Sequence, residues 1–308
     1  MVNRIIKGFK NPKRVVLYLL NINICKIIPD KLFLRLKYRL RIEKKLDLDN
    51  PKSFNEKIQW LKINDRKSEY TIMSDKYKVR DYISDKIGQE YLIPLLGCYD
   101  CYEEIDFTIL PKKFVLKANH TSGDVFICTD KEKIDHATLR KTLNRWLKRD
   151  YYSIHREWPY KNIEPKIICE EFLEDSLTDD IKDYKFMCFN GEPKLILLCQ
   201  NRQSKKGLEI DFYDIEWNLL DLKREKTPCS NNYSNKPVNY ELMKDLAKRL
   251  SENIPFVRVD FYEVNNKLYF GEMTFYPAAG FEKFNPEIYD NILGDWIDIS
   301  TIEKEIKK

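Results

Sequence analysis

Glycine and histidine are scarce in this 308-residue sequence, which has 9 glycines and 3 histidines. Aromatic residues are abundant instead, with 19 tyrosines, 16 phenylalanines and 5 tryptophans. Disordered and low-complexity chains contain few aromatic residues, so this composition excludes both classes. With 43% hydrophobic residues, the chain can bury a substantial core in one large domain or in two to three intertwined ones.

Long apolar segments are also lacking. The N-terminal runs at 15–20 and 22–28 are interrupted by Asn21, Asn23 and Lys26. Neither run is long or apolar enough to span a bilayer, and no cleavage site of the signal-peptide type is visible. The eight irregularly spaced cysteines then indicate reduced thiols, so we expect a cytoplasmic protein.

Two common site motifs are missing as well. No second cysteine pair follows the C-x-x-C formed by Cys98 and Cys101, which favours ordinary thiols over a zinc or redox site. The G-x-x-x-x-G-K-[ST] spacing of a Walker phosphate loop does not occur either. A phosphate-binding function would therefore need a different arrangement.

Positive charge is concentrated at the N-terminus. Residues 1–45 carry 13 lysines and arginines against two acidic residues, a net of +11, so the rest of this +5 chain sums to −6. We expect a basic helical arm at 1–50. The arm could lean on an anionic membrane surface, or it could pack on the body with a solvated basic face. We expect no nucleic-acid partner.

A strand hairpin with two acidic residues is predicted near the C-terminus. Residues 257–281 read VRVDFYEVNNKLYFGEMTFYPAAGF, with a turn at 265–266 between Asp260 and Glu272. Because side chains alternate along a strand, antiparallel pairing around this turn can make the two carboxylates neighbours. Two facing acids repel unless a cation separates them, so with Arg258 they suit a divalent-metal and phosphate site. The alternative is a solvated hairpin face.

The rest of the body mixes predicted helices and strands. Ser53 and Glu56 form a capping-box pattern that predicts a helix to about Ile63. Further helices are expected at 74–87, 135–149, 240–253 and 286–299. Strands are expected at 91–97, 114–117, 125–128, 166–169, 184–190, 193–200, 208–213 and 219–222. Paired strands covered by a few helices indicate an α+β fold.

Two lysines on predicted strands could meet a phosphate. Lys117 precedes a loop containing Thr121, Ser122 and Gly123. Backbone N–H groups of such a loop can cradle phosphate oxygens while a lysine supplies a point charge. Lys185 lies on a later strand. Either lysine could instead be a solvated surface residue.

The end of the strand at 166–169 offers a second type of contact. It runs into Glu170, Glu171, Phe172 and Leu173. Backbone groups at this exit could meet an adenine edge, with carboxylates near its amino group or the ribose.

The order of these pieces resembles the ATP-grasp superfamily, most closely its branch associated with teichuronopeptide biosynthesis (TupA-like). The segments that carry the resemblance are SFNEKIQWLK (53–62), SDKYKVR (74–80), FVLKANHTSG (114–123), YKFMCFNGEPK (184–194) and the hairpin at 257–281. Together they span about residues 50–290, and they are specific as an ensemble.

The resemblance implies an α+β ATP-grasp fold in which two lobes enclose ATP. The boundaries that we expect are 1–50 for the basic arm, 51–112 for a substrate-side region, 113–175 for the first lobe and 176–308 for the second. By position, the implied ATP-binding residues are Lys117, Thr121, Ser122, Gly123, Glu170, Glu171, Phe172, Leu173 and Lys185.

The resemblance also implies a catalytic end of the site. Arg258 and Lys185 would steady the transferred phosphoryl group, and Asp260 and Glu272 would hold Mg²⁺. Thr274 stands where the superfamily usually has an asparagine, so it would be a weaker third ligand. The phosphate loop also has a single glycine, where several are usual.

The implied activity is Mg-ATP-dependent ligation of a carboxylate to an amine through an acyl phosphate. We expect an acidic or uronic-acid-containing glycan as acceptor and an amino acid or peptide as amine, in cell-surface or capsular polysaccharide biosynthesis. One alternative is an ATP-dependent kinase or transferase acting on a surface glycan. Another is a non-catalytic nucleotide- or glycan-binding scaffold.

Overall fold

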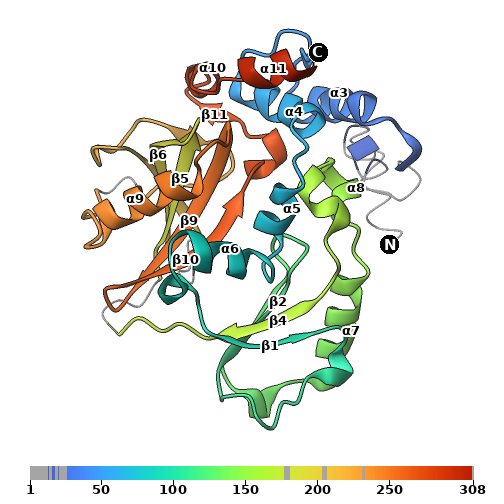
Figure 1. Ribbon diagram of the computed structural model, residues 1–308, viewed down its shortest axis with the longest axis vertical. Coiled ribbons are helices and arrows are strands. Elements are labelled where there is room, and N and C mark those ends of the chain that lie inside the picture. Colours follow the sequence, from blue (N-terminus) through green and yellow to red (C-terminus); the bar gives the residue numbers. More distant parts are fainter. Residues whose placement is uncertain are drawn as a thin grey trace.

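Figure 1 shows the computed structural model of the chain. The structure describes residues 26–176, 181–202, 207–230 and 233–306, together with Lys13, Val16, Leu17 and Leu20. Most of the first 25 residues of the predicted basic arm therefore lie outside the described residues, and the described part of the arm contains the helix α3 (Asp30–Arg41). None of the helices in the described ranges is long and apolar enough to cross a membrane.

The strands form two main antiparallel sheets and one short pair (Figure 1). The smaller sheet has the order β1 (Leu95–Tyr99), β4 (Ile167–Glu171), β2 (Phe114–Ala118) and β3 (Val125–Cys128). The larger sheet has the order β10 (Lys267–Thr274), β9 (Phe256–Val264), β5 (Asp183–Phe189), β6 (Glu192–Gln200) and β7 (Glu209–Asp214). The short pair is β8 (Lys223–Arg224) with β11 (Phe284–Asn285).

Helices cover both sheets. Besides α3, the described α-helices are α4 (Phe54–Asn64), α5 (Glu69–Ser74), α6 (Val79–Lys86), α7 (His136–Leu147), α8 (Tyr152–His155), α9 (Tyr240–Leu250), α10 (Ile288–Asp295) and α11 (Ser300–Ile306). Figure 1 shows α9 beside the larger sheet and α7 beside the smaller one, while α3, α4, α10 and α11 gather at one end. The predicted α+β class is confirmed.

The smaller sheet has one apolar face and one mixed face. Leu139, Leu143 and Trp146 of α7 join a core cluster that contains Phe114 and Leu116 of β2. Because side chains alternate along β2, Lys117 lies on the opposite face. The strand β1 also belongs to this sheet, although it precedes the boundary predicted at residue 113; the four predicted boundaries stay predictions.

The hairpins of the larger sheet form where the sequence predicts them. Asn265 and Asn266 join β9 to β10 with φ of 52° and 61°, and Asn190 and Gly191 join β5 to β6 with φ of 51° and 83°. Two successive positive φ values match the twist of antiparallel strands, and Asn and Gly adopt them most easily. These turns set the register at the start of each hairpin, and each ladder then shifts register once, between Phe270 and Glu272 and between Met187 and Cys188.

The predicted helix at 74–87 is wrong at its start. The helix α5 ends at Ser74 and α6 begins at Val79. Between them, the carboxylate of Asp75 accepts hydrogen bonds from the backbone N–H groups of Tyr77 (2.9 Å) and Lys78 (3.4 Å). An aspartate that bonds the backbone two residues ahead stabilises a turn in place of a helix.

Three other predicted elements also differ. The strand predicted at 91–97 begins at Leu95, and 219–222 forms only an isolated bridge at Leu219. The helix predicted at 286–299 is the shorter α10. The capping box of α4 is confirmed, with Ser53 and Glu56 bonding each other's backbone N–H groups at 3.1 and 3.3 Å.

Candidate functional site

A cavity of about 260 Å³ lies between the two sheets. Its walls come from the α5–α6 turn, β2 and the loop after it, β4, β5 and β10. The charged side chains that line it are Lys76, Arg80, Lys117, Glu170, Asp183, Lys185, Arg202 and Glu272. Five are cationic and three are anionic. A concave surface with an excess of positive charge favours an anionic ligand.

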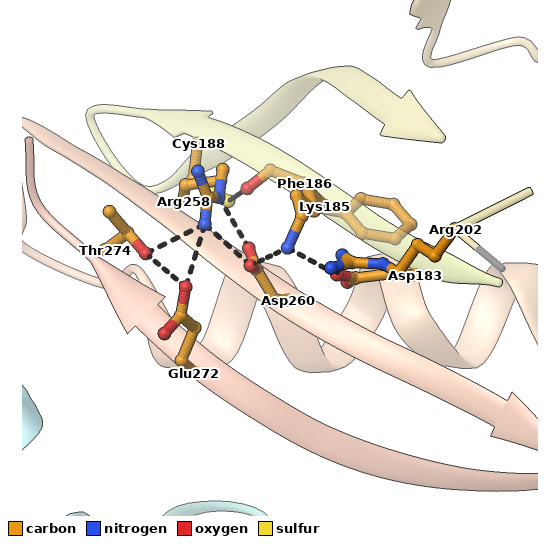
Figure 2. Close-up of polar contacts among 9 residues, drawn as sticks. All are labelled: Asp183, Lys185, Phe186, Cys188, Arg202, Arg258, Asp260, Glu272 and Thr274. Atoms are coloured by element: carbon orange, nitrogen blue, oxygen red, sulfur yellow. Dashed lines mark hydrogen bonds and ion pairs between the residues drawn. The ribbon is translucent and has the colours of Figure 1, made fainter. Parts of the chain in front are cut away.

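The predicted pairing of Asp260 with Glu272 is present. The two residues are direct partners in the β9–β10 ladder, and Arg258 joins their carboxylates (Figure 2). Its guanidinium donates to Asp260 through Nε and Nη2, both at 2.7 Å, and Nη2 also donates to Glu272 Oε1 at 3.0 Å. Thr274 Oγ1 accepts from the same nitrogen at 3.0 Å and donates to Glu272 Oε1 at 3.1 Å. The sheet therefore presents a closed network and not a solvated face.

Lys185 extends this network along β5. It is opposite Asp260 in the β5–β9 ladder, and its ammonium donates to Asp260 and forms an ion pair with Asp183 Oδ2 at 2.6 Å (Figure 2). Arg202 donates to the same Asp183 oxygen at 2.6 Å. Burial would lower the pKa of Lys185, but the two carboxylates outweigh it and raise the pKa above its usual value. Lys185 is therefore a permanent cation at physiological pH.

Glu272 is the carboxylate of this network that opens to the cavity, with 33% of its side chain exposed. Burial alone would raise its pKa. The positive charges of Arg258, Lys76 and Lys185 outweigh that effect and hold the pKa at about 2. The carboxylate is thus ionised and available as an acceptor or a ligand.

The opposite wall pairs two predicted ATP-binding residues with each other. Lys117 donates to Glu170 Oε2 at 2.5 Å. Arg80 donates to Glu170 Oε1 at 3.2 Å and to the carbonyl of Ile93 at 2.8 Å. Glu170 therefore holds two cations at the rim of the cavity. For Lys117 to bind a phosphate, it would have to exchange this carboxylate for the ligand.

The residues of the predicted phosphate loop differ in exposure and in their position relative to the cavity. Thr121 is buried, and its carbonyl accepts from the ammonium of Lys76, whereas Ser122 and Gly123 are exposed and line the cavity. Gly123 has φ of +84°, and the space beside its α-carbon is open. Of the predicted adenine-binding segment, Glu170 lines the cavity. The other three residues, Glu171, Phe172 and Leu173, are not among its described lining residues.

Lys76 is the main site residue that sequence reasoning missed. It is half-buried in the cavity wall, and the desolvation of its ammonium group lowers its pKa. Its N–H donates to the Asn119 carbonyl at 3.2 Å, and the Asn119 amide donates to Asp75 Oδ1 at 2.9 Å. These bonds tie the α5–α6 turn to the base of the phosphate loop. The SDKYKVR segment contained the signal, but a helix was expected there.

Arg80, Asp183 and Arg202 were also missed, together with the cavity residues Tyr160 and Tyr262. Their roles depend on partners far away in the sequence. His120, in contrast, is buried next to Asn119 and is not among the described lining residues, and burial lowers its pKa. This placement agrees with a structural histidine.

The predicted metal ligands supply suitable chemistry. Carboxylate and hydroxyl oxygens of the kind presented by Asp260, Glu272 and Thr274 are the ligands that Mg²⁺ prefers. Their arrangement is incomplete, because Arg258 and Lys185 occupy both oxygens of Asp260. Across the described ranges, no three His, Cys, Asp or Glu side chains lie close enough to hold a metal ion. The donors fit Mg²⁺ if Asp260 exchanges one cation for the metal.

Comparisons with known proteins identify a family for the chain. The family described as TupA-like ATPgrasp matches residues 56–298. No curated protein matches the sequence. Among solved structures, the D-alanine–D-alanine ligase of Bacillus anthracis complexed with ATP has 15% identity and a TM-score of 0.46, over 84% of this chain and 72% of that chain. The RimK domain ATP-grasp protein of Sphaerobacter thermophilus has 12% identity and a TM-score of 0.40, over 74% of this chain and 69% of that one.

The family match covers well over half of the chain, and the predicted resemblance is thereby confirmed. It includes both sheets and every residue of the carboxylate network and the facing lysines. The chain belongs to the TupA-like ATP-grasp family.

Proposed function

We propose that this protein is a Mg-ATP-dependent carboxylate–amine ligase. The observation that carries the proposal is the cavity between the two sheets, which five cationic side chains line beside the Arg258–Asp260–Glu272 network. A triphosphate needs several positive charges at once, and transfer of its terminal phosphoryl group needs further charge where the carboxylates lie. Family membership supports the same substrate.

Residues from both walls of the cavity would bind the phosphate groups of ATP. Lys76 and Lys117 approach the cavity from the smaller-sheet side, and Lys185 approaches it from the larger sheet. Their ammonium groups would bind phosphate oxygens, whereas Ser122 and Gly123 would offer backbone N–H groups from the loop. Because that loop is exposed, it could close over the bound nucleotide and keep water out.

The reaction proposed joins two substrates in two steps. A substrate carboxylate attacks the terminal phosphorus of ATP and ADP leaves, which gives an acyl phosphate. An amine then attacks the acyl carbon, the carbon–oxygen bond to the phosphate breaks, the phosphate leaves with the electron pair, and the amine nitrogen loses a proton. Arg258 would stabilise the charge of the acyl phosphate. When bound, Mg²⁺ would supply positive charge to the phosphate oxygens.

The acceptor that we propose is an acidic, uronic-acid-containing glycan or its precursor, and the amine an amino acid or peptide. The support is the resemblance to the teichuronopeptide branch and the basic arm, which would attract an acidic polymer or an anionic membrane surface. The role would thus be in cell-surface or capsular polysaccharide biosynthesis, in the cytoplasm or at the inner face of the membrane.

An ADP-release assay with a panel of amines and uronic-acid oligosaccharides tests the proposal. We expect ADP release that requires both substrates, and a product whose mass shows an amide linkage. A product that gains a phosphoryl group would identify a kinase instead. Absence of ADP release with bound ATP would identify a nucleotide-binding scaffold. Asp260→Asn is the matched inactive control for each reaction.

A further inference from the structure

We infer that Lys185 is an internal counter-ion that competes with a divalent metal for Asp260. The metal would then bind strongly only when a nucleotide draws Lys185 away. This inference rests on the proposed function, because it concerns the same metal and nucleotide. It adds an order of events that neither the family match nor the proposed reaction contains.

Both carboxylate oxygens of Asp260 accept hydrogen bonds from cationic side chains. Its side chain is buried, with 0% of the residue exposed. Oδ1 accepts from Arg258 Nε at 2.7 Å, and Oδ2 accepts from Arg258 Nη2 at 2.7 Å and from the Lys185 ammonium. A divalent ion that binds Asp260 would therefore be repelled by two cations at these oxygens unless one of them moves.

Arg258 is the poorer candidate for movement. Its guanidinium makes four hydrogen bonds to Asp260, Glu272 and Thr274, and all three partners lie on the same two strands (Figure 2). A planar group with paired donors in a fixed geometry loses several bonds at once when it rotates. Arg258 is therefore expected to stay while the metal binds.

Other acceptors are available to the Lys185 ammonium if it leaves Asp260. Its ammonium already touches Asp183 Oδ2 at 2.6 Å, and Arg202 shares that oxygen at 2.6 Å. The other oxygen, Asp183 Oδ1, is buried without a hydrogen-bond partner. An unpaired buried carboxylate oxygen is costly, so it favours an incoming ammonium group. Lys185 also lines the cavity, where a phosphate oxygen would be a second new partner.

The charges of the network disfavour a divalent metal ion until a nucleotide is present. Asp183, Asp260 and Glu272 carry three negative charges, and Lys185, Arg202 and Arg258 carry three positive charges. The network is therefore neutral without a metal. A divalent cation alone would add two positive charges to a buried, neutral network. Because a nucleotide brings negative charge and accepts the Lys185 ammonium, it removes this penalty.

The test is Mn²⁺ binding, measured by electron paramagnetic resonance without nucleotide and then with a non-hydrolysable ATP analogue. We expect weak binding by the wild-type protein without nucleotide, and at least tenfold tighter binding by Lys185→Met. The analogue should tighten Mn²⁺ binding strongly in the wild type and less in this variant. Lys113→Met is the matched control: it removes a lysine that flanks β2 outside the described lining of the cavity and pairs with the exposed Glu174, so nucleotide-free Mn²⁺ binding should not change.

Asp183→Asn serves as a second variant, for which the opposite change in Mn²⁺ affinity is expected. It removes the charge to which Lys185 would move, so Lys185 should hold Asp260 more firmly and Mn²⁺ binding with the analogue should weaken. Circular dichroism during thermal unfolding shows whether each variant folds. If Lys185→Met does not fold, Asp183→Asn decides the question alone.

Two results would overturn the inference. One is tight nucleotide-free binding of Mn²⁺ by the wild-type protein. The other is an affinity that neither variant changes. The ligase proposal survives both results, because a preformed metal site also supports ligation. Conversely, the expected Mn²⁺ pattern without any amide product would refute the ligase proposal and leave the competition standing.

Discussion

Two buried lysines of this protein, Lys185 in the site and Lys62 outside it, have opposite surroundings. The ammonium of Lys185 lies between the carboxylates of Asp183 and Asp260, which raise its pKa despite burial. Lys62 has 0% of its residue exposed and donates to three neutral oxygens: Gln59 Oε1 at 3.1 Å, His155 O at 3.0 Å and Ala279 O at 2.8 Å. Burial lowers its pKa to about 7.

The contrast shows that hydrogen bonds and charge compensation are separate requirements. Neutral oxygens satisfy the donors of Lys62, but they do not replace the solvation that its charge loses on burial. At Lys185, the carboxylates supply both the hydrogen-bond acceptors and the compensating negative charge. A lysine that must meet a phosphate needs a secure charge, and its partners in the site provide one. A lysine that positions backbone can function with a weaker charge.

Lys62 does position backbone near the site. Ala278 and Ala279 have φ of 48° and 55°, a left-handed conformation that is unfavourable for alanine. Lys62 and Gln59 of α4 donate to the Ala279 carbonyl, and Gln59 also donates to the Gly280 carbonyl at 2.6 Å. This turn begins a few residues after Thr274, so α4 fixes the path by which the chain leaves the site.

The largest expected effect tests the carboxylate side of the comparison. Asp260→Asn and Glu272→Gln should each lower ATP turnover by about 1,000-fold or more, because the site loses charge that opposes the lysines and holds the metal. Steady-state ADP release, with Mg²⁺ and both substrates, measures this effect. Both variants should still unfold cooperatively in urea. Turnover that persists in both variants would remove these residues from the catalytic site.

A smaller effect is expected on the opposite wall. Lys117→Ala should weaken ATP binding by about 10- to 100-fold, the range for loss of one charged hydrogen bond of about 1.5–3 kcal/mol. Isothermal titration calorimetry with an ATP analogue gives the change directly. Lys113→Ala is the matched control, because Lys113 flanks the same strand but pairs with the exposed Glu174. Equal affinities in both variants would place the phosphates elsewhere.

The site was predictable where its geometry is local. The Asn-Asn turn predicts that Asp260 and Glu272 lie close together on paired strands, but the shift in register between Phe270 and Glu272, which makes them direct partners, could not be predicted. Lys76 was not predictable in this way. Its place depends on the turn at Asp75, and that turn depends on a bond to Asn119, which is 44 residues away.

Partners distant in the sequence explain the remaining differences. Lys117 and Arg80 meet Glu170 from 53 and 90 residues away, so no local pattern shows that an expected adenine contact neutralises an expected phosphate contact. Likewise, alternation predicts which residues share a face of the strand with Asp260, but not that Lys185 of β5 donates to its second oxygen. Local rules predicted the strands, and sheet order decided the contacts.

The smallest expected effect concerns Lys62 and the pH dependence of stability. Its pKa is about 7 in the folded protein and near 10.5 when unfolded, so between these values unfolding takes up a proton. Stability must then rise with pH above 7, by at most about 1.4 kcal/mol per pH unit. Lys62→Met removes this contribution, so wild type should gain about 1–2 kcal/mol relative to the variant between pH 7 and pH 9.

Urea unfolding at the two pH values measures that difference. Burial and the charge of Lys62 lower the pKa of Lys37 to about 7, so the Lys37 contribution becomes smaller in the variant and adds to the same difference. Burial raises the pKa of Glu157 to about 7 against the charge of Lys62, so the variant has a still higher Glu157 pKa and loses stability above pH 7, which has the same sign. The exposed Lys45→Met should show no such trend. If the difference between wild type and Lys62→Met is independent of pH, Lys62 keeps its proton on neutral oxygens alone, and the contrast with Lys185 fails.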